Sequence, residues 1–210
     1  MGAAVIDHLV YATPDLDGTV DALSELLGVR AVPGGRHVGR GTHNALLGLG
    51  GRTYLEVIGP DPAQQVPPGT PLPFRIDRLE APALVWYAVA TDRLAELVAE
   101  LRGDGFDPGD PLDMQRARPD GVLLRWRLAT HADIPHGGVV PFLIDWLDSP
   151  HPSADVPQGV RLVELRATHP DADRLRPWLA RTGDPVALTA GAQPGLSALL
   201  DTPKGPITLR

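Results

Sequence analysis

Cysteine is absent from the 210 residues of this chain. Its absence excludes disulfides, thiolate metal sites and cysteine nucleophiles together. A surplus of basic residues is absent too. The net charge of −7 argues against binding along a nucleic-acid backbone, so we expect no nucleic-acid partner.

Long apolar runs are also missing. None approaches the roughly 20 residues that span a bilayer, so we expect no membrane partner. The start, Met1-Gly2-Ala3-Ala4, carries no basic segment followed by an apolar one, and this predicts a cytoplasmic protein. No Gly-x-Ser-x-Gly elbow supports a hydrolase triad. The glycine-rich stretch 34–41 lacks the Gly-Lys-Ser/Thr ending of a phosphate loop.

What the chain does contain is enough apolar sequence for a packed core, since 43% of its residues are hydrophobic. Alternating apolar residues predict a strand over 5–12. Leucine and valine at helical spacing then predict a helix that begins after Pro14-Asp15 and ends at Gly28. The glycine-rich loop, a strand from His43 and a hairpin at Gly50-Gly51 complete a βαβββ unit over residues 1–60.

The same pattern of elements restarts twice. Residues 61–82 are rich in proline and predict a linker, and residues 83–150 predict a second βαβββ unit. Residues 158–210 predict a third, incomplete unit, which either packs on the first two or lies at the interface of a homodimer. Similar strand–helix junctions mark the three units, so the fold class is α+β with repeated βαβββ units.

Two predicted strands carry an ionisable residue near their middle, His8 in the first and Glu56 in the last strand of unit one. Such a group is costly to bury unless it is paired, hydrogen-bonded or bound to a metal. Imidazole and carboxylate are suitable ligands for a divalent metal. Without a metal, the pair can act as an acid/base couple.

The motifs resemble a known family. Ile6-Asp7-His8-Leu9-Val10 and Tyr54-Leu55-Glu56-Val57-Ile58 look like the opening and closing strands of the vicinal oxygen chelate superfamily, which includes glyoxalase I and extradiol dioxygenases. Three further stretches resemble the glyoxalase-like domain group within it. They are Gly34-Gly35-Arg36-His37 with Gly41-Thr42-His43-Asn44, then 118–127, which begins Arg118-Pro119-Asp120-Gly121, and Pro141-Phe142-Leu143-Ile144-Asp145-Trp146.

The resemblance implies two βαβββ units that form a half-open barrel with a mixed sheet and helices on the outer face. It also implies metal ligands from the first and last strands of each unit. His8 and Glu56 match these positions in unit one, whereas Trp86 matches His8 in unit two, and we expect Asp145 to match Glu56. If unit one paired with unit three instead, Glu164 would join His8 and Glu56 as a metal ligand.

Strand alternation assigns the remaining side chains to faces. On the strand from Gly121 to Thr130, we expect Val122, Leu124, Trp126 and Leu128 to pack under a helix and Arg125 and Arg127 to face the cavity. Two arginine forks suit a carboxylate or phosphate. Together with these patterns, the resemblance implies Glu56 and His43 as catalytic residues and His8, Glu56 and Glu164 as ligands of Zn, Ni, Mn or Fe. The predicted substrate-binding residues are Arg36, His37, Asn44, Trp86, Arg125, Arg127 and Asp145.

Three functions remain open. In the first, the chain acts on a small, oxygenated, anionic metabolite by metal-assisted proton transfer or lyase/isomerase chemistry. In the second, it is a metal-free protein that binds or sequesters a small molecule. In the third, it is a structural module, which would require side chains to fill the concave face.

Overall fold

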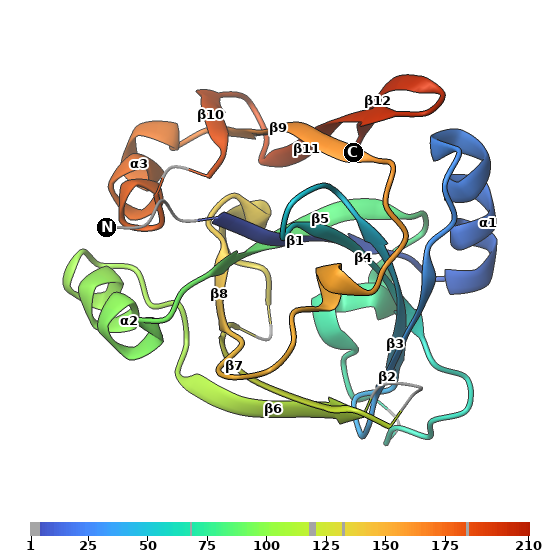
Figure 1. The fold of residues 1–210 in the computed structure, drawn as a ribbon. Helices are drawn as coiled ribbons and strands as arrows, with labels where there is room; N and C mark the ends of the chain where they lie inside the picture. Colours follow the sequence, from blue (N-terminus) through green and yellow to red (C-terminus); the bar gives the residue numbers. More distant parts are fainter. Residues whose placement is uncertain (1–4, 68, 118–120, 132, 184) are drawn as a thin grey trace.

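The computed structural model describes residues 5–67, 69–117, 121–131, 133–183 and 185–210. The predicted cytoplasmic start, Met1-Gly2-Ala3-Ala4, and Arg118-Pro119-Asp120 of the family-like stretch lie outside the described residues. The model is a mixed α+β protein with an eight-stranded sheet curled into a nearly closed barrel and a separate four-stranded sheet (Figure 1).

The first half of the barrel is one βαβββ unit. Asp15 caps its helix by accepting a hydrogen bond from the Gly18 amide, and Gly28 ends it in the left-handed conformation that glycine favours, as predicted. Its elements are β1 (Val5–Ala12), α1 (Leu16–Leu27), β2 (Val32–His37), β3 (Thr42–Gly48) and β4 (Tyr54–Pro60).

The second half repeats this order. A short 3-10 helix, Pro73–Arg78, precedes it, and another, Pro135–Gly138, precedes its last strand. Its elements are β5 (Ala83–Ala90), α2 (Leu94–Gly103), β6 (Pro111–Ala117), β7 (Leu123–Ala129) and β8 (Phe142–Asp145).

The two halves join through β1 and β5, which pair antiparallel. The strand order is β2-β3-β4-β1-β5-β8-β7-β6, and the two edge strands, β2 and β6, approach each other and nearly close the barrel. α1 and α2 lie outside the barrel, on opposite sides of it (Figure 1). The consecutive units therefore form the barrel, and the alternative pairing of the first unit with the third does not occur among the described strands.

A β-bulge interrupts the pairing of β1 with β5. Ile6 pairs with Val89 and His8 pairs with Ala88, so the register shifts at Asp7. In a regular strand, adjacent side chains point to opposite faces, and a bulge re-aims them. Both Asp7 and His8 are buried, and their side chains meet.

Residues 158–210 form the four-stranded sheet with one helix. They follow the order strand, helix, three strands, but β9 pairs with β10 and β11 rather than with the last strand. The sheet attaches to the barrel by backbone hydrogen bonds from Leu162 to Leu49 and from Leu84 to Arg210. Its elements are β9 (Arg161–His169), α3 (Ala172–Arg181), β10 (Ala187–Ala190), β11 (Gly195–Thr202) and β12 (Gly205–Leu209), with a 3-10 helix, Pro152–Ala154, before β9.

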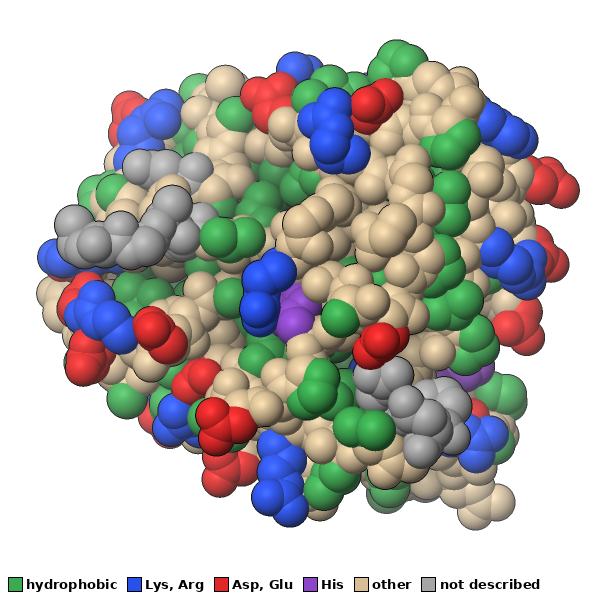
Figure 2. All heavy atoms as spheres, viewed as in Figure 1, with side chains coloured by type: hydrophobic (Ala, Val, Ile, Leu, Met, Phe, Trp, Pro, Cys, Tyr) green, Lys and Arg blue, Asp and Glu red, His purple; other side chains and the backbone are tan. Residues whose placement is uncertain are grey.

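Acidic and basic side chains are interspersed, with apolar ones between them, over the face that Figure 2 shows. Among the described residues, no helix is long and apolar enough to cross a membrane.

Candidate functional site

The barrel encloses a cavity of about 610 Å³, which is within the range of small-molecule sites. One part of its lining is polar and comes mostly from the first half of the barrel. The polar residues there are His8, His37, Arg40, Asn44, Glu56 and Arg116. The opposite part is apolar and comes mostly from the second half and from the segment before β5. Its larger side chains are Leu72, Phe74, Met114, Trp126, Leu128, Phe142, Ile144 and Trp146.

Glu56, on β4, lies at the centre of the polar part. Its Oε1 accepts a hydrogen bond of 2.6 Å from the Asn44 side-chain amide. Its Oε2 lies 3.7 Å from His8 Nε2, and its Oε1 lies 3.7 Å from His37 Nε2. Glu56 is 8% exposed as a residue, so one amide and two imidazoles surround its carboxylate in a largely dry environment.

The bulge in β1 places a second carboxylate behind His8. Asp7 Oδ1 lies 2.7 Å from His8 Nδ1, and this contact turns His8 Nε2 toward Glu56 and the cavity. Tyr54 stacks on the His8 ring with centroids 4.8 Å apart, and Phe142 meets the ring edge-on. The orientation of His8 is therefore set on several sides.

Asp7 is 2% exposed and has two further partners. Trp146 Nε1 donates to its Oδ2 at 2.9 Å, and His151 Nε2 lies 3.0 Å from the same oxygen. Burial by itself would raise the pKa of Asp7, but hydrogen bonds from His151 and His8 and the charge interactions with both lower it to about 2. Asp7 is therefore ionised at neutral pH.

Asn44 connects Glu56 to the edge of the barrel. While its amide nitrogen donates to Glu56, its oxygen accepts a 3.0 Å hydrogen bond from Arg116 on β6. Arg116 is 7% exposed, so this contact bridges the gap between β3 and β6 inside the protein. Gly34 on β2 packs directly against both side chains, so a larger residue at position 34 would clash with them.

His37, at the end of β2, faces the same carboxylate. Its Nδ1 lies 2.9 Å from Thr42 Oγ1, and its Nε2 lies toward Glu56. Burial lowers the pKa of His37, whereas the charge of Glu56 raises it and that of Arg116 lowers it. The structure therefore brings together four of the predicted residues, His8, His37, Asn44 and Glu56.

Arg36 and His43 lie elsewhere. They pair with each other across β2 and β3, one residue out of step with His37 and Asn44, so alternation directs them away from the cavity. Arg36 Nε lies 3.3 Å from Asp61 Oδ2. Burial raises the pKa of Asp61, but hydrogen bonds from Gln64 and Ala63 and the charge of Arg36 lower it overall. Neither residue lines the cavity.

The predicted faces of β7 are reversed. Trp126 and Leu128 line the cavity, while Arg125 is exposed and Arg127 binds Asp145 at 2.6 Å. The short helix α2 packs on β7 and β8, and Ala129, at the end of β7, is fully buried. Over the preceding part of β7, the outer face meets solvent and carries Arg125 and Arg127. The larger apolar side chains therefore turn inward.

Phe142, not Asp145, is the counterpart of Glu56. Thr13 and Thr91 directly follow the first strands of the two units and correspond to each other. In unit one, Val10 of β1, three residues before Thr13, pairs with Glu56. In unit two, Ala88, three residues before Thr91, pairs with Phe142. Asp145 lies three residues further on and forms an ion pair with Arg127.

Trp86, the counterpart of His8, is a core residue. It is 1% exposed, donates from Nε1 to the Val140 carbonyl at 2.7 Å and packs edge-on against Phe142. It does not line the cavity.

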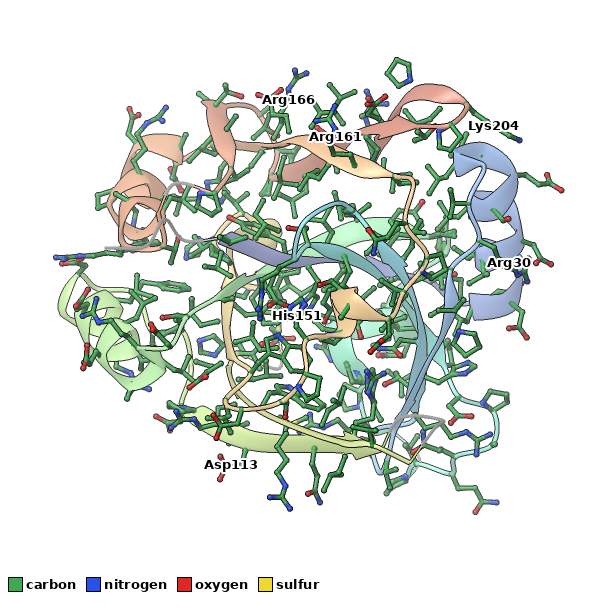
Figure 3. The ribbon with its side chains drawn as sticks, viewed as in Figure 1. Arg30, Asp113, His151, Arg161, Arg166 and Lys204 are labelled. Carbon is green, nitrogen blue, oxygen red and sulfur yellow. The ribbon has the colours of Figure 1, made fainter. Side chains whose placement is uncertain are left out.

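Glu164 is also remote from His8. It lies in β9 of the four-stranded sheet, where its carboxylate binds Arg166 at 2.5 Å. Figure 3 shows Arg166 on the outer side of that sheet, whereas the segment that carries His151 crosses the barrel. Glu164 therefore has no place in a site with His8 and Glu56.

The side chains at these positions do not match the ligand set of the metal that the family resemblance implies. Such a metal takes donors from both halves of the barrel, and here the second half offers two aromatic side chains, Trp86 and Phe142. Within the described ranges, no group of three or more His, Asp or Glu side chains is arranged to hold a metal. The side chains around His8 and Glu56 therefore do not fit a divalent metal.

Sequence reasoning missed several residues of the site. Asp7 could have been identified as a site residue, because it is ionisable and adjacent to His8 in an apolar strand. Regular alternation, however, assigned it to the other face of the strand. Arg116 and His151 carried no local signal, since the chain brings them to the site from distant elements. Arg40 and Trp146 lie within the stretches quoted above but were not predicted as site residues.

Solved structures resemble this fold. A hypothetical protein from Staphylococcus aureus aligns with a TM-score of 0.65 and 14% identity, covering 98% of this chain and 84% of that chain. Methylmalonyl-CoA epimerase from Mycobacterium tuberculosis aligns at 0.45 and 19%, covering 70% and 93%. A Streptomyces coelicolor methylmalonyl-CoA epimerase variant aligns at 0.48 and 19%, covering 72% and 100%. At these identities the likeness concerns the fold alone.

No curated protein matches this chain. A family model described as a glyoxalase-like domain matches residues 6–183, which include the whole barrel and extend into the third unit. The match covers most of the chain and agrees with the barrel of two βαβββ units. The chain therefore belongs to the glyoxalase-like domain family.

Proposed function

We propose that the cavity binds a small molecule with an oxygenated, anionic head and an apolar body, and that Glu56 and His8 move a proton on it without a metal. The observation that carries this proposal is the position of Glu56. Its carboxylate is buried and lies 3.7 Å from the Nε2 atoms of both His8 and His37, at the polar end of a mostly apolar cavity.

The apolar wall supports the apolar body. Trp126 and Trp146 contact each other with ring centroids 5.4 Å apart, and Phe142 continues the same wall. Aromatic rings contribute a large contact area to a ligand at low entropic cost. A purely ionic ligand would leave this surface without a partner, so we expect a ring or branched chain here.

Arginines support the anionic head. Arg40 lines the cavity beside His37 and contacts the thioether of Met114 at 3.4 Å, and a thioether is a weak acceptor. Arg116 lines the same end. These two replace Arg125 and Arg127 as the residues that hold a carboxylate or phosphate.

The chemistry follows from this placement. Glu56 takes a proton from a carbon next to a carbonyl of the bound molecule, and the electrons move to the carbonyl oxygen. The positive charge of Arg116 stabilises that oxygen, and Glu56 returns the proton to carbon. His8, with an unprotonated Nε2, is the alternative base that takes and returns the proton. A positioned acid/base group contributes about 10²–10⁴ to such a rate.

Exchange with deuterated solvent tests the proposal. A panel of small 2-oxo and 2-hydroxy acids with aliphatic or aryl side chains is incubated with the protein in D₂O and followed by NMR. We expect exchange at the carbon next to a carbonyl, which is C3 of a 2-oxo acid and C2 of a 2-hydroxy acid, reduced by about 10² or more in Glu56→Gln. Glu164→Gln, in the remote sheet, is the matched control and leaves exchange unchanged.

A metal-free binding protein is the second candidate. It is favoured by the 2.6 Å hydrogen bond that already engages Glu56 with Asn44, since this bond suits a fixed polar contact. Ligand binding detected by quenching of tryptophan fluorescence, with no exchange on any member of the panel, would select this function. The structural module loses its support because the concave face is open rather than filled.

A further inference from the structure

The buried carboxylate of Asp7 contacts ring nitrogens of three different side chains. Its Oδ1 contacts His8, and its Oδ2 contacts both Trp146 and His151. The three distances are 2.7, 2.9 and 3.0 Å. Residues 146 and 151 belong to the segment that follows β8, so a chain stretch about 140 residues from Asp7 encloses it. Figure 3 shows His151 in this segment.

Ser153 determines which nitrogen of His151 carries the proton. The backbone N–H of Ser153 points at His151 Nδ1 at 3.2 Å. A backbone N–H can only donate, so Nδ1 accepts and the ring proton is on Nε2. His151 therefore donates from Nε2 to Asp7, and the indole of Trp146, which is a donor only, does the same.

Two N–H groups on Oδ2 leave Asp7 as an ionised acceptor, so the short contact at Oδ1 requires a donor on His8. We infer that Asp7 and His151 are positioning residues that hold His8 with its proton on Nδ1 and its Nε2 lone pair turned toward the cavity. The catalytic consequence rests on the proposed function, because only an unprotonated Nε2 can take a proton from the bound molecule.

The same geometry predicts what an amide would do in place of Asp7. The oxygen of an asparagine would face Trp146 and His151, which are both donors there. Its NH₂ group would then face His8 Nδ1 and donate to it. The proton of His8 would move to Nε2, and the lone pair would be lost from the cavity side.

Long-range ¹H–¹⁵N correlation spectra of the ligand-free, ¹⁵N-labelled protein at mildly alkaline pH test this inference. The signals of His8 and His151 are assigned by their disappearance in His8→Gln and His151→Gln. We expect opposite tautomers in one network, with His8 protonated on Nδ1 and His151 on Nε2. A neutral His8 protonated on Nε2 in the wild type overturns the inference, and this result needs no variant at Asp7 to fold.

Asp7→Asn supplies the second measurement. We expect the His8 proton to move to Nε2 and exchange on the acid panel to fall by about 10² or more. Asp61→Asn is the matched control, because Asp61 is also buried but contacts Ala63, Gln64 and Arg36 rather than His8, and it leaves the tautomer of His8 unchanged. An unchanged tautomer in a folded Asp7→Asn protein overturns the inference.

The two proposals fail in different ways. If the wild type shows the expected tautomers but exchanges no member of the panel, the proton transfer fails and the positioning of His8 stands. If exchange occurs while His8 carries its proton on Nε2, the positioning fails and the proton transfer stands.

Discussion

Gly34 lies directly against Asn44, with no room for a side chain between them. A methyl group on Gly34 would overlap the amide oxygen of Asn44 and come within 2.9 Å of Arg116 Nη1. The hydrogen bond between those two side chains would then break or shift, and with it the support of Glu56.

Gly34→Ala is therefore expected to lower the free energy of unfolding by about 1–3 kcal/mol, as overpacking of a tight site does. Ligand binding should weaken as well. Urea unfolding and fluorescence titration measure the two effects. The control is Gly103→Ala at the end of α2, where an added methyl meets no atom within 4 Å and should not destabilise the protein. Equal unfolding midpoints for the two variants would contradict this prediction.

A metal is not expected to bind at His8 and Glu56, because Trp86 and Phe142 occupy the matching positions in the other half of the barrel. Metal analysis should find less than one divalent ion per chain in protein purified without chelators, and also after incubation with Zn, Ni, Mn or Fe(II). One equivalent that disappears in both His8→Ala and Glu56→Ala, but persists in Glu164→Gln, would show that the site completes its ligand set in another way.

The pH dependence of stability should report Asp7. The pKa of this carboxyl falls from 3.8 to about 2 on folding, so folding favours its ionised form. That contribution, about 2 kcal/mol, is fully present above pH 3.8 and is lost as the pH falls toward about 2. Urea unfolding between these pH values should show the loss in the wild type. The difference from Asp7→Asn should shrink over the same range, and a constant difference would contradict the assignment.

The pKa of His37 should respond to Glu56. Burial holds this pKa below 6.5, and the charge of Glu56 partly opposes that effect. Removal of the charge in Glu56→Gln should therefore lower the pKa of His37 further, since the opposing effect is lost. NMR titration of the imidazole signals measures the shift, with Glu164→Gln as the control. A rise in the pKa of His37 would show that its surroundings differ from those described here.

The sequence was informative wherever the structure depends on local pattern. The period of the apolar residues and the caps at Asp15 and Gly28 predicted α1. The sequence predicted Asn44 and Glu56 as site residues, and both line the cavity, but it also predicted His43, which lies on the opposite face of its strand. The repeat of strand–helix junctions indicated repeated βαβββ units, because each junction consists of a few adjacent residues, whereas the barrel of two such units was what the family resemblance implied.

The sequence could not determine how distant elements meet. The faces of β7 were reversed because the extent of α2 on the outer surface decides which face is dry. Asp145 was matched to Glu56 because the register of β8 against β5 depends on pairing, and that register selects Phe142.

Asp7 and His151 show the limit most clearly. Their contact joins β1 to a segment about 140 residues away, and it needs a bulge that lets two adjacent side chains turn inward together. The sequence was enough to single out His8 and Glu56, because an ionisable residue inside an apolar strand is a local feature. The tertiary structure alone decided what surrounds them, because burial and hydrogen bonding are properties of the packed chain.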